Sequence, residues 1–247
     1  MDPSSLIGPL HRGLSLVFDG PQGAAEACGD RILEILDEAR RERGRATLAV
    51  SGGSTPRLMF QAMAKRSFDW SNVQIFQVDE RCVPPDHELS NFRMTRESLL
   101  SAAAIGENQF HRVRGELAPE EAARLYVEEI RESFHLSPGE LPVFDAIQRG
   151  MGPDGHTASL FPGEPLIGDR TGIAAAVYVE KMMQHRVTLL PGVLERARHT
   201  LCLVTGADKA EALHKVLRGP FDPMNVPSQI ASPDMTWYID KNAGAKL

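Results

Sequence analysis

Short apolar runs alternate along most of the chain with longer stretches of helical periodicity. The runs fall at Leu14–Phe18, Thr47–Ser51, Val73–Asp79, Val143–Ile147, Ile173–Val179, Val187–Leu190, Thr200–Thr205 and Thr236–Ile239. Runs of this length are typical of strands that are buried on both faces. Gln22–Arg43 and Ala118–His135 have helical spacing, and a third helix is expected over Pro56–Arg66, with Thr55 as its cap. The alternation predicts a mainly parallel sheet with helices on both faces.

The length of 247 residues fits one large α/β domain. No internal repeat, heptad array or low-complexity segment interrupts the pattern, and the Pro/Gly-containing stretches 84–86, 137–142 and 218–227 are long enough only for loops. We therefore expect a single domain over residues 1–247.

The charge balance bears on the class of ligand. A net charge of -6 gives no general attraction for nucleic acid or an anionic membrane, so a small molecule is the expected partner. The three cysteines form no C-x-x-C pair and no H-E-x-x-H motif occurs, so neither a disulfide framework nor a metal site is expected. Residues 1–13 lack the apolar core of a signal peptide, and no run approaches membrane-spanning length. A reducing cytoplasm fits best.

The most informative segment is Gly150–Gly163, GMGPDGHTASLFPG, which follows a predicted strand. It places Asp154 and His156 two residues apart on a glycine-rich turn, at the sheet edge where ligands bind in open α/β folds. Glycine permits close ligand approach, and histidine exchanges protons near neutral pH. The pair is the leading catalytic candidate. Thr157–Phe161 is expected to form a short helix.

A second motif, SGGSTP at 51–56, links a predicted strand to the third predicted helix. Gly52 and Gly53 would let an anion approach backbone N–H groups, Ser54 and Thr55 supply hydroxyls, and the helix N-terminus adds positive potential. The plainer interpretation is an ordinary capped helix start. The lysine of a Walker loop is missing, which argues against a nucleotide triphosphate.

A third motif, VDER at 78–81, brings charged side chains to the same edge. Arg81 could bind an oxyanion through its planar donor fork, or could simply pair with a neighbouring carboxylate. Asp79 could orient substrate hydroxyls, act as a base, or cap the next turn.

Further cations come from the C-terminal half. Arg186 opens a predicted strand, Lys181 precedes it in a loop, and Lys209 falls in the first turn of a predicted helix. All three are candidate phosphate ligands, although single lysines are usually solvated surface groups. A serine nucleophile is disfavoured, because no G-x-S-x-G elbow occurs.

Taken together, SGGSTP, VDER with Ser90–Asn91 downstream, the DGHTASLFPG segment, RVTLLP at 186–191 and VTGADKAEAL at 204–213 resemble the 6-phosphogluconolactonase family. The order and spacing match across nearly the whole chain. DGHTASLFPG is specific to that family, whereas the G-G-S-T-P loop is shared with sugar-phosphate isomerases and deaminases of the same fold.

The resemblance implies hydrolysis of 6-phospho-D-glucono-1,5-lactone to 6-phosphogluconate in the oxidative pentose phosphate pathway, without metal or organic cofactor. It also implies a three-layer α/β/α fold with a Rossmann-like sheet of the sugar-phosphate isomerase/deaminase type. His156 would act as general base on water, and Asp154 would orient it. The phosphate would bind at residues 51–55 with Arg81, Arg186 and either lysine. A monomer is favoured.

Two positions depart from the family pattern. Cys82 stands where an aromatic residue usually follows D-E-R, and Gln148–Arg149 replaces apolar residues before the catalytic turn. Because burying an unpaired arginine is costly, Arg149 is expected to have a carboxylate partner or access to solvent. Two alternatives stay open: an amino-sugar phosphate isomerase or deaminase that uses Asp79 as proton shuttle, and a non-catalytic sugar-phosphate sensor.

Overall fold

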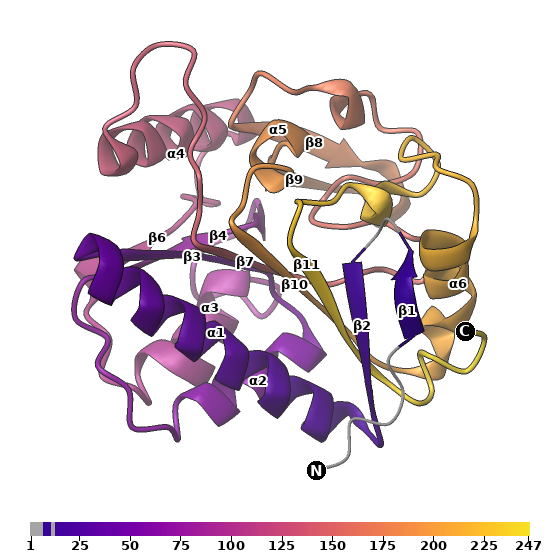
Figure 1. Ribbon diagram of the computed structural model, residues 1–247. Coiled ribbons are helices and arrows are strands. Elements are labelled where there is room, and N and C mark those ends of the chain that lie inside the picture. The colour runs from indigo at the N-terminus through magenta and orange to yellow at the C-terminus, as the bar shows by residue number, and fades with distance from the viewer. Residues whose placement is uncertain (1–6, 11–12) are drawn as a thin grey trace.

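The computed structural model describes residues 7–10 and 13–247, so most of the N-terminal segment considered for a signal peptide lies outside the described residues. Its main sheet has the order β1-β2-β11-β10-β7-β3-β4-β6 (Figure 1). The strands are β1 (Ile7–Leu10), β2 (Gly13–Phe18), β3 (Ala46–Val50), β4 (Val73–Gln77), β6 (Phe110–His111), β7 (Ala146–Arg149), β10 (His199–Val204) and β11 (Met235–Asp240). Only the β1–β2 pair of this sheet is antiparallel within the described ranges.

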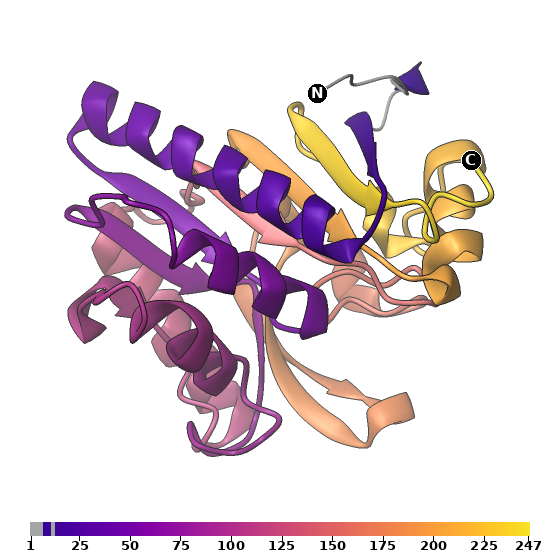
Figure 2. The ribbon, with the colours of Figure 1, turned by 90° about the horizontal axis from the view of Figure 1, so that it is seen from below.

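Three of the predicted strand segments depart from the parallel arrangement. β5 (Asp79–Arg81), β9 (Gln184–Leu189) and β8 (Ala174–Val179) form a separate antiparallel sheet in that order. The predicted run Val73–Asp79 divides at Val78, whose N–H donates to Val50 in the main sheet while its carbonyl accepts from Leu189 in the second. The β8–β9 hairpin extends away from the main sheet (Figure 2).

Helices cover both faces of the main sheet (Figures 1 and 2). One face packs against α1 (Pro21–Arg43), α2 (Ser54–Met63) and α3 (Asn91–Thr95), and the other against α4 (Pro119–Phe134), α5 (Pro191–Leu194), α6 (Ala210–Arg218) and the second sheet. A short π-helix, η1 (Arg96–Leu100), follows α3, and the 3₁₀ helices are η2 (Glu107–Gln109), η3 (Pro165–Gly168), η4 (Glu180–Met182), η5 (Ala207–Lys209) and η6 (Pro227–Gln229).

Strand β10 shows how the two cores divide. Leu201 and Leu203 belong to the core beneath α1 and α2, whereas Cys202 and Val204 pack with α6 on the opposite face. Because successive strand side chains point to opposite faces, one strand contributes to both layers. The predicted three-layer α/β/α architecture is confirmed.

The start of α2 differs from its prediction. The helix begins at Ser54 and ends at Met63, with Gly53 as N-cap, rather than running from Pro56 behind a Thr55 cap. Gly53 has φ 125°, a conformation that favours glycine, so the helix begins two residues earlier than the proline suggested. The Thr55 hydroxyl instead lies 2.8 Å from that of Thr205.

Strand β7 carries the unusual polar pair into the sheet. It spans Ala146–Arg149 instead of Val143–Ile147, and it lies between β3 and β10. The expectation for Arg149 was wrong: its side chain is fully buried and no carboxylate of the described residues pairs with it. Nη2 donates to the Ile230 carbonyl and lies 3.6 Å from the Met235 sulfur, while Nε and Nη1 have no partner in the described part of the chain. Because β7 lies between β3 and β10 in the middle of the sheet, the Arg149 side chain does not reach water.

Helix length and apolar content decide whether a helix can span a bilayer. Among the described residues, none is both long and apolar enough to cross a membrane.

Candidate active site

A cleft of about 240 Å³ opens where neighbouring parallel strands end. Strands β10, β7, β3 and β4 end side by side, so the turns that follow them converge on one edge of the sheet. Of the predicted site residues, those that line this cleft are Gly52, Gly53, Ser54, Thr55, Asp79, Arg81, His156, Arg186 and Lys209. Asp154 lies behind His156, and Lys181 lies outside the cleft lining.

The turn after β7 holds His156 by tight local packing. Gly155 has φ 84°, and a Cβ at Gly152 would overlap the imidazole ring, so both positions suit only glycine. The predicted helix over Thr157–Phe161 is wrong. Leu160 N–H donates to the Thr157 carbonyl at 3.0 Å and Ala158 adopts φ 52°, a left-handed conformation that a right-handed helix does not contain.

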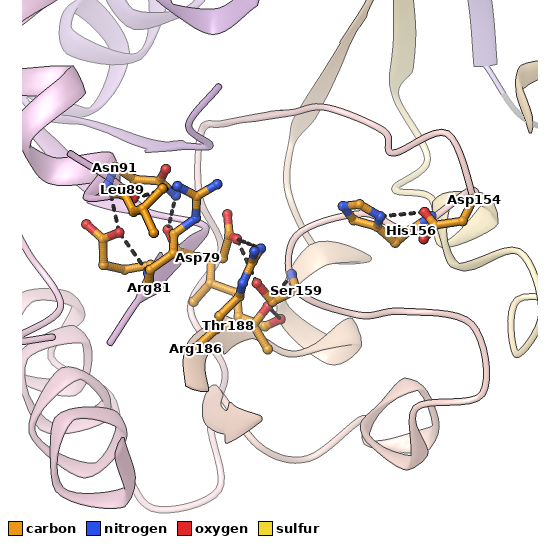
Figure 3. Close-up of polar contacts among 11 residues, drawn as sticks. Asp79, Arg81, Leu89, Asn91, Asp154, His156, Ser159, Arg186 and Thr188 are labelled. Atoms are coloured by element: carbon orange, nitrogen blue, oxygen red, sulfur yellow. Dashed lines mark hydrogen bonds and ion pairs between the residues drawn. The ribbon is translucent and has the colours of Figure 1, made fainter. Parts of the chain in front are cut away.

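His156 and Asp154 form a hydrogen-bonded pair, Nδ1 to Oδ1 at 2.5 Å (Figure 3). Burial lowers the pKa of His156 by more than Asp154 raises it. Burial acts to raise the pKa of Asp154, but the His156 and Lys181 contacts outweigh it and lower this pKa to about 2. The pair at neutral pH is therefore a carboxylate and a neutral imidazole whose Nδ1–H donates to Asp154. Nε2 is left with a free lone pair, as a general base requires.

Lys181 takes a different position from the one considered for it. Its Nζ lies 3.0 Å from Asp154 Oδ2, and its side chain is 61 % exposed on η4, at the tip of the β8–β9 hairpin. The structure therefore places it behind the Asp154–His156 pair rather than beside the glycine-rich turn.

The glycine-rich turn after β3 forms one end of the cleft. A Cβ on Gly52 would overlap the Asn91 side chain, which also lines the cleft. Backbone N–H groups at the start of α2 point along the helix toward this end, where the helix dipole favours an anion. The ordinary cap interpretation fails in one respect, since no side chain caps this helix.

Two arginines reach the cleft from the second sheet (Figure 3). Arg81 Nη1 donates to the Leu89 carbonyl at 2.5 Å, and no carboxylate among the described residues lies within ion-pair distance of its guanidinium. Arg186 is buried, with Nη1 4.0 Å from Asp79 Oδ2. Burial lowers the pKa of Arg186, and the proximity of Arg81 adds to this effect. Two adjacent cations with unused donors are suited to a phosphate.

Asp79 is buried at the wall of the cleft. Its Oδ2 accepts from the Ser159 hydroxyl at 2.7 Å, and Ser159 N–H donates to the Thr188 hydroxyl (Figure 3). The side chain therefore does not cap the turn that follows it. It remains placed to orient a substrate hydroxyl or to exchange a proton.

Lys209 reaches the cleft from the segment between β10 and α6. It ends η5 and precedes α6 as its N-cap, one position before the helical turn predicted for it. Its Nζ lies 2.9 Å from Asp208 Oδ2, a neighbour in the chain. It still lines the cleft.

Glu80 is the main residue that the sequence interpretation missed. It is buried and accepts hydrogen bonds from the backbone N–H groups of Arg81, Asn91 and Phe92, and from Gln77 and Ser90 side chains. Burial outweighs these donors and raises the pKa of Glu80. Glu80 thus fixes Arg81 and Asn91 at the cleft wall. Its position between the candidate ligands Asp79 and Arg81 in VDER was the sequence signal that could have identified it.

Among residues 7–10 and 13–247, no group of three or more His, Cys, Asp or Glu side chains could hold an ion. Cys82, partly buried beside Glu80, has its pKa raised by burial to about 11 and so is a thiol at neutral pH.

Comparison with known proteins agrees with this geometry. The sequence model of the glucosamine-6-phosphate isomerases/6-phosphogluconolactonase family matches residues 19–238. The chain belongs to this family. A family member from Synechocystis sp. (strain ATCC 27184 / PCC 6803 / Kazusa), named 6-phosphogluconolactonase, is 37% identical over 217 residues, which cover 86% of this chain and 89% of the relative.

Solved structures extend the family comparison to the fold. The 6-phosphogluconolactonase from Trypanosoma cruzi superimposes with a TM-score of 0.84 at 26% identity, covering 94% of this chain and 96% of that one. A monomeric glucosamine-6-phosphate deaminase superimposes with a TM-score of 0.80 at 17% identity, covering 94% and 99%, which shows a common fold alone. The family predicted from the motifs is confirmed.

Proposed function

We propose that this chain hydrolyses 6-phospho-D-glucono-1,5-lactone to 6-phosphogluconate, the lactone-opening step of the oxidative pentose phosphate pathway. One observation carries the proposal: a single cleft is lined by a neutral, carboxylate-paired imidazole, by the glycine-rich turn after β3 and by two arginines. Family membership and the relatives named 6-phosphogluconolactonase support the same reaction.

The substrate's phosphate would occupy the turn of Gly52, Gly53, Ser54 and Thr55. Backbone N–H groups and hydroxyls would donate to its oxygens, and Arg81 and Arg186 would supply the opposing charge. Lys209 lines the same space and would add a third cation. The net negative charge of the chain makes this local cluster necessary for binding a phosphate.

His156 would act as the general base. Its Nε2 takes a proton from water as the water oxygen attacks C1 of the lactone, and the imidazolium then returns that proton to the ring oxygen as the C1–O bond breaks. Asp154 holds the imidazole through Nδ1 and stabilises the transient imidazolium. Asp79 also lines the cleft, held in place by Ser159, and would orient a sugar hydroxyl.

The test generates the lactone in place by oxidising glucose 6-phosphate and follows its loss above the spontaneous background. Unphosphorylated gluconolactone serves as the parallel substrate. We expect strong acceleration restricted to the phosphorylated lactone, because unphosphorylated gluconolactone has no phosphate group for the cation cluster to bind. No acceleration would overturn the proposal, and ammonia release from glucosamine 6-phosphate would then identify the deaminase alternative.

The base is tested by His156→Asn. We expect turnover to fall by about a hundred- to ten-thousand-fold, the usual contribution of general acid–base assistance, while affinity for inorganic phosphate is retained. Turnover close to that of the wild type would show that His156 is not the base. The phosphate measurement separates loss of chemistry from loss of the fold.

A further inference from the structure

Phe161 contacts both groups on which the proposed chemistry depends. Its ring stacks on the His156 imidazole, with centroids 4.0 Å apart and planes inclined by 23°. The guanidinium carbon of Arg186 lies 5.8 Å from the same ring centroid. His156 comes from the turn after β7 and Arg186 from β9, so one aromatic side chain joins two separate elements.

Each neighbour of Phe161 has few polar contacts of its own. The imidazole packs against Gly152 and, among the described residues, has one side-chain hydrogen bond, through Nδ1. Arg186 has a single carboxylate contact, at 4.0 Å, and its buried Nε has no partner among the described residues. The Phe161 ring against the imidazole face further limits rotation of the imidazole about its bond to Cβ, and the π-face of the ring attracts the Arg186 guanidinium.

We propose that Phe161 is a positioning residue that holds the base His156 and the phosphate ligand Arg186 at a fixed spacing. The proposal rests on the proposed function and adds to it a residue that need not touch the substrate. A fixed spacing matters because the phosphate anchors one end of the lactone while water attacks the other. Misplacement of reacting groups by about 1 Å can cost a hundredfold in rate.

The environment of His156 predicts a second effect of losing the Phe161 ring, a change in the pKa of His156. Asp154 faces it from its own turn, Asp79 from β5 and Arg186 from β9, while Lys181 acts through Asp154. Replacing the ring with a smaller side chain leaves these charges in place but admits water. Since burial is the main cause that lowers the pKa of His156, its pKa should rise on exposure.

The experiment compares Phe161→Leu, which removes the ring, with Phe161→Tyr, which keeps it. We expect Phe161→Leu to lower kcat by about ten- to a hundredfold, more than it raises KM, and to move the acid limb of kcat/KM to higher pH. Phe161→Tyr should recover most of the rate. Phe68→Leu is the matched control, since Phe68 also lies 5.8 Å from an arginine, Arg40, but outside the cleft lining.

A readout independent of turnover is the NMR titration of the His156 imidazole, which should shift upward in Phe161→Leu and not in Phe68→Leu. An unchanged titration with kcat within twofold of the wild type would overturn the inference, as would a tyrosine variant as impaired as the leucine one. Phe161→Met replaces Phe161→Leu if the latter does not fold. Failure of the wild type to accelerate lactone loss would overturn the proposed function, while the titration would still decide the role of Phe161.

Discussion

Asp154 illustrates how one side chain can serve two segments at once. Its Oδ1 binds His156 and its Oδ2 binds Lys181 from the hairpin tip. These two contacts keep the Asp154 carboxylate ionised. The carboxylate orients the His156 imidazole, and the Lys181 ammonium neutralises part of its charge. Lys181 was considered as a phosphate ligand on sequence grounds, and its geometry favours a role in setting the proton affinity of the pair.

Lys181→Met should therefore move the pH profile without abolishing activity. Without the ammonium, the pKa of Asp154 rises from about 2 but the group stays ionised at neutral pH. Its less neutralised charge favours protonated His156, so the pKa of His156 rises. Activity requires the neutral imidazole, so the loss on acidification should begin at a higher pH than in the wild type. The measurement is kcat/KM against pH.

The shift should be small, because the Lys181 side chain is 61 % exposed and water screens the pair. We expect less than about a fivefold change in rate at pH 8. Lys246→Met is the control, since Lys246 forms a comparably exposed ion pair with Glu211. An acid limb that moves to lower pH, or a large loss of phosphate affinity, would contradict this assignment and restore Lys181 as a ligand.

Among the helices and strands, the strand–turn–helix unit of β3 and α2 makes a close contact with α3 at Gly52. Asn91, at the start of α3, packs where a side chain on Gly52 would lie, and its Nδ2 donates to the Asp79 carbonyl at 2.9 Å. The phosphate-binding turn and the Asp79–Arg81 strand therefore share one close contact. A substitution in either segment should therefore disturb the geometry of the other.

Gly52→Ala should raise KM for the phosphorylated lactone by roughly tenfold or more, because the added Cβ displaces Asn91 or the turn itself. The effect on kcat should be smaller, since His156 belongs to another element. Gly20→Ala is the control: it precedes α1 and has open space where a Cβ would lie. Steady-state kinetics of both variants decide the matter, and an unchanged KM in Gly52→Ala would refute the close-packing argument.

The sequence pattern predicted helices, strands and turns well where they depend on local backbone preferences. The strands around β3 and β10, the long helices and the glycine-rich turns follow from periodicity and dihedral preference. The errors have tertiary causes: Ala158 adopts a positive φ within the packed turn, and Arg149 is enclosed by strands far away in sequence. The role of Ser159 could not be predicted either, because its partner Asp79 comes from another element, and only the position of Glu80 within VDER indicated a role for it.

In the molecule as a whole, the cleft joins segments from both sheets, so its occupation should stabilise the entire fold. A ligand at 100 times its Kd adds about 2.7 kcal/mol to the free energy of unfolding. For a chain of this size each kcal/mol raises Tm by about 2–4 °C. We expect 6-phosphogluconate to raise the Tm of the wild type by several degrees, measured by calorimetry, and to do so less at high salt.

Arg81→Met should lose most of that ligand-induced rise, because its guanidinium has donors to spare for a phosphate. Arg124→Met, which removes an exposed ion pair on α4, should keep it. Equal stabilisation of both variants by the ligand would place the phosphate away from Arg81.

The strand order has a consequence for how the protein is made. Leu14 in β2 pairs with Thr236 in β11, and the Gly206 N–H beside the cleft donates to Asp240 at the end of the same late strand. During synthesis from the N-terminus, the edge of β2 that pairs with β11 stays unpaired until β11, more than 200 residues later, has been synthesised. Such nonlocal closure is slow and leaves nascent chains prone to aggregation. Recovery of activity should accordingly be among the last events in refolding, after the C-terminal strand has docked.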